Sequence, residues 1–254
     1  MNKQISHVFA AAALTIAVIV FASVATAAEK PVKVVVGELE AEFNGGFSPK
    51  AISKTKLTPI VFNISGKMRS LNPQEPHVPA LKEFLFEGDK NASISVKGIP
   101  VCKAGQLQSR DTAGARKVCG SAIIGTGKTE AGIKFPEQPE IPVKSELLAF
   151  SGGEKGGVIT LFIHAYITVP TPAAIVTTVK VKKIHKGRYG TGSVATIPKI
   201  AGGSGSVKSF SLTFQKGIIS AKCPDGHLNA RGTAVFADGT RASGGVVRTC
   251  TGKG

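Results

Sequence analysis

Two apolar runs on either side of a Pro-Thr-Pro break dominate the middle of the chain. In the first run the odd-numbered residues are all apolar, whereas the even-numbered ones are mixed: Thr160, Phe162, His164, Tyr166 and Thr168. Successive side chains of a strand point to opposite faces, so this alternation predicts a strand with one wholly apolar face. The second run alternates in the same way, with Lys180 and Lys182 on its polar side. Since proline cannot continue a ladder, we expect two strands joined by a short connection.

Shorter alternating runs, separated by turn-forming residues, fill most of the remaining chain. Pro224-Asp225-Gly226 and Asp238-Gly239 are typical of hairpin turns. The stretch 100–120 differs, because Ser109 or Asp111 can cap a short helix over 113–118. We therefore predict an all-β fold, an antiparallel sandwich or barrel-like sheet of roughly a dozen strands with one short disulfide-stapled helix. Residues 29–254 form one domain in this interpretation, with a possible subdivision near 152–157.

The stretch 33–43 alternates with three glutamates on one face, and it predicts one strand. Such a carboxylate row can bind a cation, but it is more typical of the solvated face of an edge strand.

The first 28 residues have the pattern of a secretory signal peptide. Lys3 precedes a long apolar run, and small residues follow it, which places a cleavage site near Ala27 or Ala28. An uncleaved membrane anchor is the alternative. The pattern predicts a secreted, extracytoplasmic protein without a transmembrane segment in its mature chain.

The chain contains four cysteines, an even number that favours disulfides in an exported protein. Four cysteines allow three pairings. We favour Cys102–Cys119 and Cys223–Cys250, because each pair encloses a short segment. Closely spaced CxxC or CxxH motifs are absent, so we predict no metal site.

Catalytic motifs are absent from the sequence, and it indicates neither a catalytic residue nor a cofactor. Residues 122–129 imitate the end of a phosphate-binding loop, but a strand-like stretch follows instead of a helix. His164 and Tyr166 are candidates for a ligand-facing aromatic patch. A histidine held between the sheet and a covering loop is the plainer interpretation of His164.

Basic residues outnumber acidic ones by 32 to 16, and the excess is strongest after residue 155. Such a charge attracts anionic partners. The export signal and the scarcity of stacking aromatics argue against a dedicated nucleic-acid-binding protein. The expected partner is an anionic envelope polymer, a lipid surface or an acidic protein, although the charge can also serve solubility alone. The candidate binding residues are Lys180, Lys182, Lys183, Lys186 and Arg188, together with His164 and Tyr166.

Five blocks of the sequence, at 47–68, 79–91, 98–108, 115–127 and 164–207, resemble a family of uncharacterised secreted bacterial proteins. The resemblance spans nearly the whole mature chain. It implies an exported, cysteine-containing, β-rich domain, and it implies no activity, ligand or catalytic residue.

Three functions follow as hypotheses. The first is a non-enzymatic envelope or extracellular protein that binds an anionic surface through its basic C-terminal half. The second is a hydrolase or other enzyme acting on anionic polysaccharide or lipid, with His164 and Tyr166 beside a groove. The third is a carrier of a small apolar ligand, in which alternating strands close around a cavity.

Overall fold

The computed structural model describes residues 29–254, and the predicted signal peptide lies outside the described residues. The described chain is almost entirely β-structure, which confirms the predicted fold class. Its strands are β1 (Val32–Val36), β2 (Leu39–Ser48), β3 (Ala51–Ser53), β4 (Thr58–Ser70), β5 (Leu81–Asp89), β6 (Ala92–Ile94), β7 (Ile123–Ile133), β8 (Ile141–Lys155), β9 (Val158–Ile167), β10 (Ala173–Lys186), β11 (Tyr189–Thr196), β12 (Gly205–Ala221), β13 (His227–Phe236), β14 (Arg241–Thr249) and β15 (Thr251–Lys253). The helix α1 covers Thr112–Cys119, and 3-10 turns cover Ala104–Gln106, Gly120–Ala122 and Ile200–Gly203.

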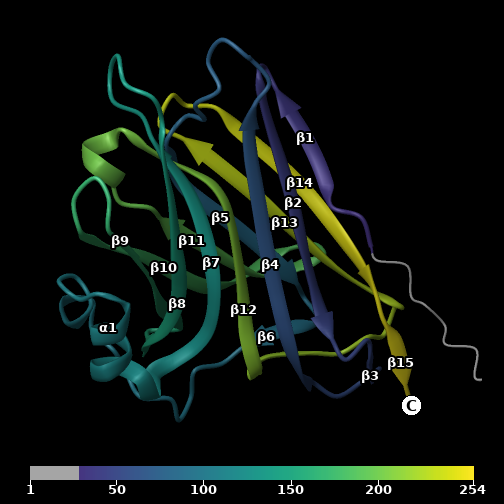
Figure 1. Cartoon of the computed structure of the whole chain (residues 1–254). Helices are drawn as coiled ribbons and strands as arrows, with labels where there is room; N and C mark the ends of the chain where they lie inside the picture. Colours follow the sequence, from purple (N-terminus) through teal and green to yellow (C-terminus); the bar gives the residue numbers. More distant parts are fainter. Residues whose placement is uncertain (1–28) are drawn as a thin grey trace, which may run out of the picture.

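One large antiparallel sheet contains all strands except β3 and β15, and it curls into a nearly closed barrel (Figure 1). The strand order around the wall is β1-β2-β4-β12-β7-β8-β9-β10-β11-β5-β13-β14, and β6 is a side branch on β12. The two outer strands of this path, β1 and β14, lie beside each other. Among the described residues no hydrogen-bonded ladder joins them. We call this contact between β1 and β14 the seam.

The predicted central strand pair is confirmed as the hairpin β9–β10. The two strands run antiparallel, with Ile175 opposite Ala165 and Val181 opposite Ile159. The odd-numbered apolar side chains of both strands point into the barrel, where they border its interior. Gly156 and Gly157 form the preceding turn, between β8 and β9, and both have positive φ angles, of 59° and 73°.

Chain segments cross both ends of the barrel. We call the end that carries β3 and β15 the lower end, as drawn in Figure 1, and the opposite end the upper end. The segments 71–80 and 197–204 cross the upper end, because each joins strands that are distant in the wall. The segments 89–92 and 222–226 cross the lower end in the same way. Connections of this kind cover the open ends of the sheet.

Two local features depart from the sequence prediction. The single strand predicted over 33–43 is wrong, because the chain turns at Gly37, whose φ is 57°, and forms the hairpin β1–β2. The inward positions are even-numbered in β1 and odd-numbered in β2, and the prediction missed this change of phase at the turn. In addition, β15 pairs with β3 in parallel, as a separate two-stranded sheet at the lower end.

The segment 102–122 packs on the outer face of β8 and β9 and carries the predicted helix. The Asp111 side chain accepts a hydrogen bond of 2.7 Å from the Gly114 amide and caps α1, one of the two caps expected. Both favoured cysteine pairings, Cys102–Cys119 and Cys223–Cys250, are confirmed as disulfides. The first fastens the helical segment to itself where it covers Leu148 and Phe150.

Candidate functional site: an apolar cavity

A cavity of about 290 Å³ runs through the interior of the barrel. Strands send alternate side chains inward, and almost all inward positions are apolar. Several of these inward side chains are only partly buried: Ile64, Phe84, Ile163, Ile175, Ala195 and Phe210. These side chains line the cavity. The alternating pattern that usually fills a core here surrounds a lumen.

Phenylalanine rings form one side of the cavity. The rings of Phe62 and Phe86 are 5.7 Å apart, and those of Phe84 and Phe210 are 5.1 Å apart in an edge-to-face arrangement. Phe62 and Phe210 come from β4 and β12, whereas Phe84 and Phe86 come from β5, which lies far along the wall. Aromatic contacts therefore bridge the barrel here, as between the two layers of a sandwich.

Smaller side chains form the opposite side of the cavity, on β9, β10 and β11. Ile163, Ala165 and Ile175 alternate there with inward hydroxyl residues such as Thr177 and Ser193. Within residues 29–254 neither hydroxyl makes a side-chain hydrogen bond to the protein. This side can accept weakly polar groups, while the aromatic side can accept only apolar ones.

Both charged residues that border the cavity, Asp89 and Arg248, are hydrogen-bonded to other groups of the protein. The Asp89 carboxylate accepts hydrogen bonds from the Asn91 amide at 2.8 Å, the Asn229 amide at 2.8 Å and the Asn229 side chain at 3.0 Å. Arg248 is 8% exposed. Its guanidinium donates to the Gly45 carbonyl at 2.6 Å and to the Asn44 side-chain oxygen at 2.7 Å. No unpaired charge of the described residues therefore faces the lumen.

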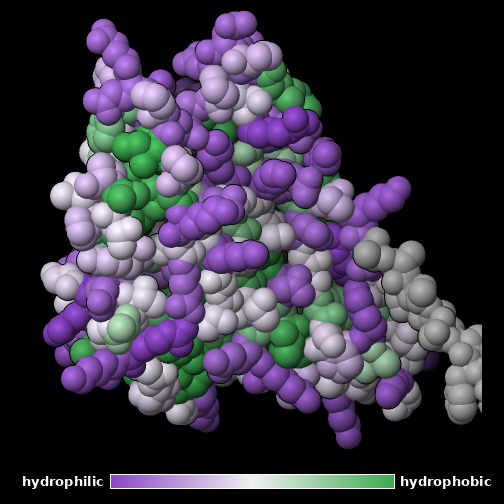
Figure 2. Space-filling view, viewed as in Figure 1, coloured by the Kyte–Doolittle hydropathy of each residue, from purple (hydrophilic) through white to green (hydrophobic). Residues whose placement is uncertain are grey.

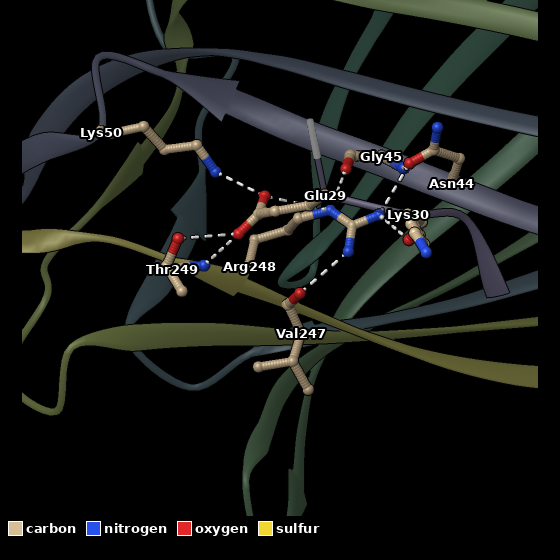
Figure 3. A network of polar contacts seen from close by, with 8 residues as sticks. All are labelled: Glu29, Lys30, Asn44, Gly45, Lys50, Val247, Arg248 and Thr249. Carbon is tan, nitrogen blue, oxygen red and sulfur yellow. Dashed lines mark hydrogen bonds and ion pairs between the residues drawn. The ribbon is translucent and has the colours of Figure 1, made fainter. Parts of the chain in front are cut away.

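Arg248 and Glu29 also close the lower part of the seam (Figure 3). Glu29 lies 3.4 Å from Arg248 Nε, and it accepts hydrogen bonds from the Thr249 amide at 2.6 Å and from Lys50 at 2.8 Å. Burial alone would raise the pKa of Glu29, but the hydrogen bonds from Lys50 and Thr249 outweigh it and lower that pKa. Side-chain contacts thus connect β14 to β2 and to the residues just before β1, at a place where no backbone ladder joins these strands.

A second polar cluster holds the segment 71–80 across the upper end. His77 Nδ1 is 2.6 Å from one carboxylate oxygen of Glu140, and Lys208 Nζ is 2.6 Å from the other. Burial would raise the pKa of Glu140, but hydrogen bonds from Lys208 and His77 outweigh it and lower that pKa. The Ser206 hydroxyl donates to the carbonyl of Val78, which is fully buried. This segment is therefore fixed across the upper end by both apolar and polar contacts.

His164 and Tyr166 lie on the outer face of β9, so neither borders the cavity. His164 is completely buried, and its Nε2 donates to the Arg110 carbonyl at 2.8 Å. Its Nδ1 has no hydrogen-bond partner among the described residues. Burial lowers the pKa of His164 and outweighs the hydrogen bond to Arg110, which raises it. The imidazole therefore helps to attach the helical segment to the sheet, as the plainer interpretation expects.

The predicted basic residues lie on β10 and its following turn, away from His164. Lys180 donates to the Thr160 hydroxyl at 2.8 Å, and Lys186 lies 3.2 Å from Glu87. Arg188 donates to the Asn229 side chain at 3.2 Å. Lys182 and Lys183 are exposed and have no acidic partner among the described residues. The structure thus brings the cationic candidates together, but it separates them from His164 and Tyr166.

The carboxylate row of β2 pairs with basic side chains. Glu40 accepts from Arg69 at 2.8 Å, and both Glu40 and Glu42 lie 3.8 Å from Lys33. Hydrogen bonding to Arg69 lowers the pKa of Glu40. Among residues 29–254 no group of three or more His, Cys, Asp and Glu side chains is placed to hold a metal ion. The solvated-face interpretation of this row therefore fits its surroundings.

Comparisons with protein families, curated proteins and solved structures found no match to the chain. The resemblance to secreted bacterial proteins therefore stays a prediction. Within the described part of the chain, no helix has both the length and the apolarity needed to cross a membrane.

Sequence reasoning missed most of the residues around the cavity. It identified the inward faces of β9 and β10, but not the phenylalanines of β4, β5 and β12 that lie opposite. Phe84 and Phe86 do alternate along β5, which is a usable signal for an inward face. That signal predicts burial, and it does not predict which distant strand the ring contacts.

Proposed function

We propose that this protein binds a small, neutral, apolar molecule inside its barrel. The observation that carries the proposal is the cavity of about 290 Å³, whose inward side chains are apolar or hydroxyl-bearing at nearly every position. A natural ligand site is concave and mostly apolar, with few polar groups, and this cavity has those properties.

The size and lining of the cavity support a ligand rather than water. An apolar cavity of roughly 150 Å³ stays dry and takes up benzene or xenon, because water finds too few hydrogen-bond partners there. The cavity described here is larger and similarly poor in free polar groups. Its apolar lining gains free energy when an apolar molecule covers it.

The electrostatics of the lining favour a neutral ligand. An ionised group in an apolar interior needs a charged or hydrogen-bonding partner. Asp89 and Arg248 already have partners within the protein. Thr177 and Ser193 offer hydroxyl groups to an alcohol or a carbonyl. The expected ligand class is thus a neutral apolar compound with at most a weakly polar group.

The test is a fluorescence titration of the intact protein with N-phenyl-1-naphthylamine, an uncharged probe that becomes bright in apolar surroundings. We expect saturable binding, and we expect 1-decanol to displace the probe more effectively than decanoate at neutral pH. Ser193→Phe fills space beside Phe86 and Val181, which are its neighbours in register. This variant is expected to lose at least about tenfold in affinity, because its phenyl ring takes up cavity space that the ligand would otherwise fill.

Val194→Phe is the matched control, because Val194 follows Ser193 on the same strand and points outward. It is expected to keep the affinity of the unmodified protein. Absence of saturable probe binding would refute the proposal, and so would equal losses in the two variants.

A further inference from the structure

Basic residues gather at one end of the barrel rather than in one half of the sequence. The short turns of the lower end, taken with the strand residue on either side of each and without the long β6–β7 connection, contain eight bases and two acids. The bases are Lys50, Lys54, Lys56, Lys90, Lys155, Lys186, Arg188 and Lys222, and the acids are Asp89 and Asp225. The same count at the upper end gives three bases, Lys134, Lys199 and Arg241, and five acids, Glu38, Glu75, Glu137, Glu140 and Asp238. The molecule is therefore electrically polarised along the barrel.

The cationic end keeps most of its charge free. Lys50 and Lys186 pair with Glu29 and Glu87, but the other six bases have no acidic partner within the described residues. Asp89 is buried and hydrogen-bonded to Asn91 and Asn229, so it does not face the same surface. On the face seen in Figure 2, hydrophilic side chains lie along the lower edge with hydrophobic ones between them. Asp225 and Glu154, which directly precedes Lys155, are the exposed acids at or beside these turns, against six bases without an acidic partner among the described residues.

An exposed leucine lies within this cationic end. Leu57 is 53% exposed in the β3–β4 turn, directly after Lys54, Thr55 and Lys56. The Ser53 hydroxyl accepts hydrogen bonds from the Thr55 and Lys56 amides, at 3.2 and 3.0 Å, so the turn has a defined shape. An apolar side chain among lysines matches the boundary between lipid headgroups and acyl chains.

We infer that the lower end docks on an anionic phospholipid bilayer, with the lysines at the headgroups and Leu57 at the acyl boundary. Each lysine near an anionic membrane surface contributes about 1 kcal/mol, or roughly fivefold in affinity. An anionic glycopolymer would use the lysines equally well, but it provides no apolar phase for Leu57. The inference is independent of the ligand in the lumen, since it concerns the outer surface alone.

The first test is sedimentation of the full mature chain with phosphatidylglycerol vesicles and with phosphatidylcholine vesicles. We expect binding to phosphatidylglycerol that weakens as salt is added, and little binding to phosphatidylcholine. Lys54→Gln with Lys56→Gln is expected to weaken the binding about twentyfold or more. Lys199→Gln with Arg241→Gln removes the same charge from the upper end, and it is expected to change the binding by less than about twofold.

The second test uses the absence of tryptophan from the chain. Leu57→Trp introduces a single reporter, whose emission should shift to shorter wavelength on phosphatidylglycerol vesicles. Leu71→Trp is the control, because Leu71 is 40% exposed in the segment across the upper end. Leu57→Ser should weaken vesicle binding, while Leu71→Ser should not.

Several results would overturn the docking proposal. One is equal binding of the protein to both kinds of vesicle. Another is an equal loss of vesicle affinity in the lower-end and upper-end charge variants. A third is an emission spectrum of Leu57→Trp that lipid does not change. Binding to dextran sulfate without binding to phosphatidylglycerol vesicles would assign the cationic end to a polymer instead. Probe binding in the lumen is expected to be unaffected by Lys54→Gln with Lys56→Gln, so the two proposals fail separately.

Discussion

The two faces of the β8–β9 hairpin differ in how they are covered. On the outer face, Leu148, Phe150 and His164 are completely buried beneath the disulfide-bonded helical segment. On the inner face, Leu147, Leu161 and Ile163 all border the cavity, and although the two leucines are buried, Ile163 is only partly buried. Both faces come from the same two strands and the same alternation. Burial of an apolar face is favourable on either side of the sheet. The segments around that face determine whether it becomes part of a packed core or the wall of a lumen.

Two adjacent positions on neighbouring strands test this difference most strongly. Leu148→Ala empties a closely packed site, and we expect a loss of about 3–5 kcal/mol in the free energy of unfolding. Ile163→Ala only enlarges a cavity that already exists, so the expected loss is about 1 kcal/mol. Chemical denaturation of both variants measures the difference. Equal losses would show that the inner face is packed like the outer one.

Removal of the Cys102–Cys119 disulfide should destabilise the outer face without changing the lumen. The bond closes a loop with a sequence separation of 17, which corresponds to about 3 kcal/mol in the chain-entropy model. Cys102→Ser with Cys119→Ser is expected to lower the unfolding free energy by about that amount. Its affinity for N-phenyl-1-naphthylamine should stay the same at a temperature where the variant is folded. A parallel loss of affinity would mean that the helical segment shapes the cavity.

A smaller effect is expected from the buried histidine of the outer face. Burial keeps the pKa of His164 below its ordinary value of 6.5 in the folded protein. As the pH falls below 6.5, the unfolded chain takes up a proton first, so the free energy of unfolding decreases until the folded-state pKa is passed. The slope from one such group is at most about 1.4 kcal/mol per pH unit.

His164→Phe should flatten this decrease, as followed by denaturation at a series of pH values. His185→Phe is the control, since His185 is exposed on β10. An unchanged pH profile in His164→Phe would contradict the assigned environment of this histidine.

The sequence predicted the elements of the fold better than the site that they form. The β9–β10 hairpin, the Asp111 cap and both cysteine pairs follow from local patterns, because alternation, capping and short loop closure act over neighbouring residues. The contact of Phe62 with Phe86 does not follow, since it joins strands that are distant in the wall. The turn at Gly37 was also missed, although the inward positions change there from even-numbered to odd-numbered residues.

The lumen itself could not be predicted from the inward residues alone. Ile159, Ile163 and Ile175 have the same side chain, yet Ile159 is buried and the other two border free space. Ile159 belongs to a buried cluster that also contains Val96, and Ile94 of β6, which follows the crossing at the lower end, packs against that cluster. The positions of such crossing segments depend on the whole topology, so no local pattern reveals them. The charge polarity of the barrel is hidden in the same way, because its lysines are scattered along the sequence.

A crystal of the protein exposed to xenon under pressure reveals whether the barrel is hollow and apolar inside. Xenon occupies dry apolar cavities and needs no hydrogen bond. We expect xenon density between the phenylalanines of β4 and β5 and the isoleucines of β9 and β10. A barrel filled by side chains or by ordered water, with no xenon inside, would contradict this expectation.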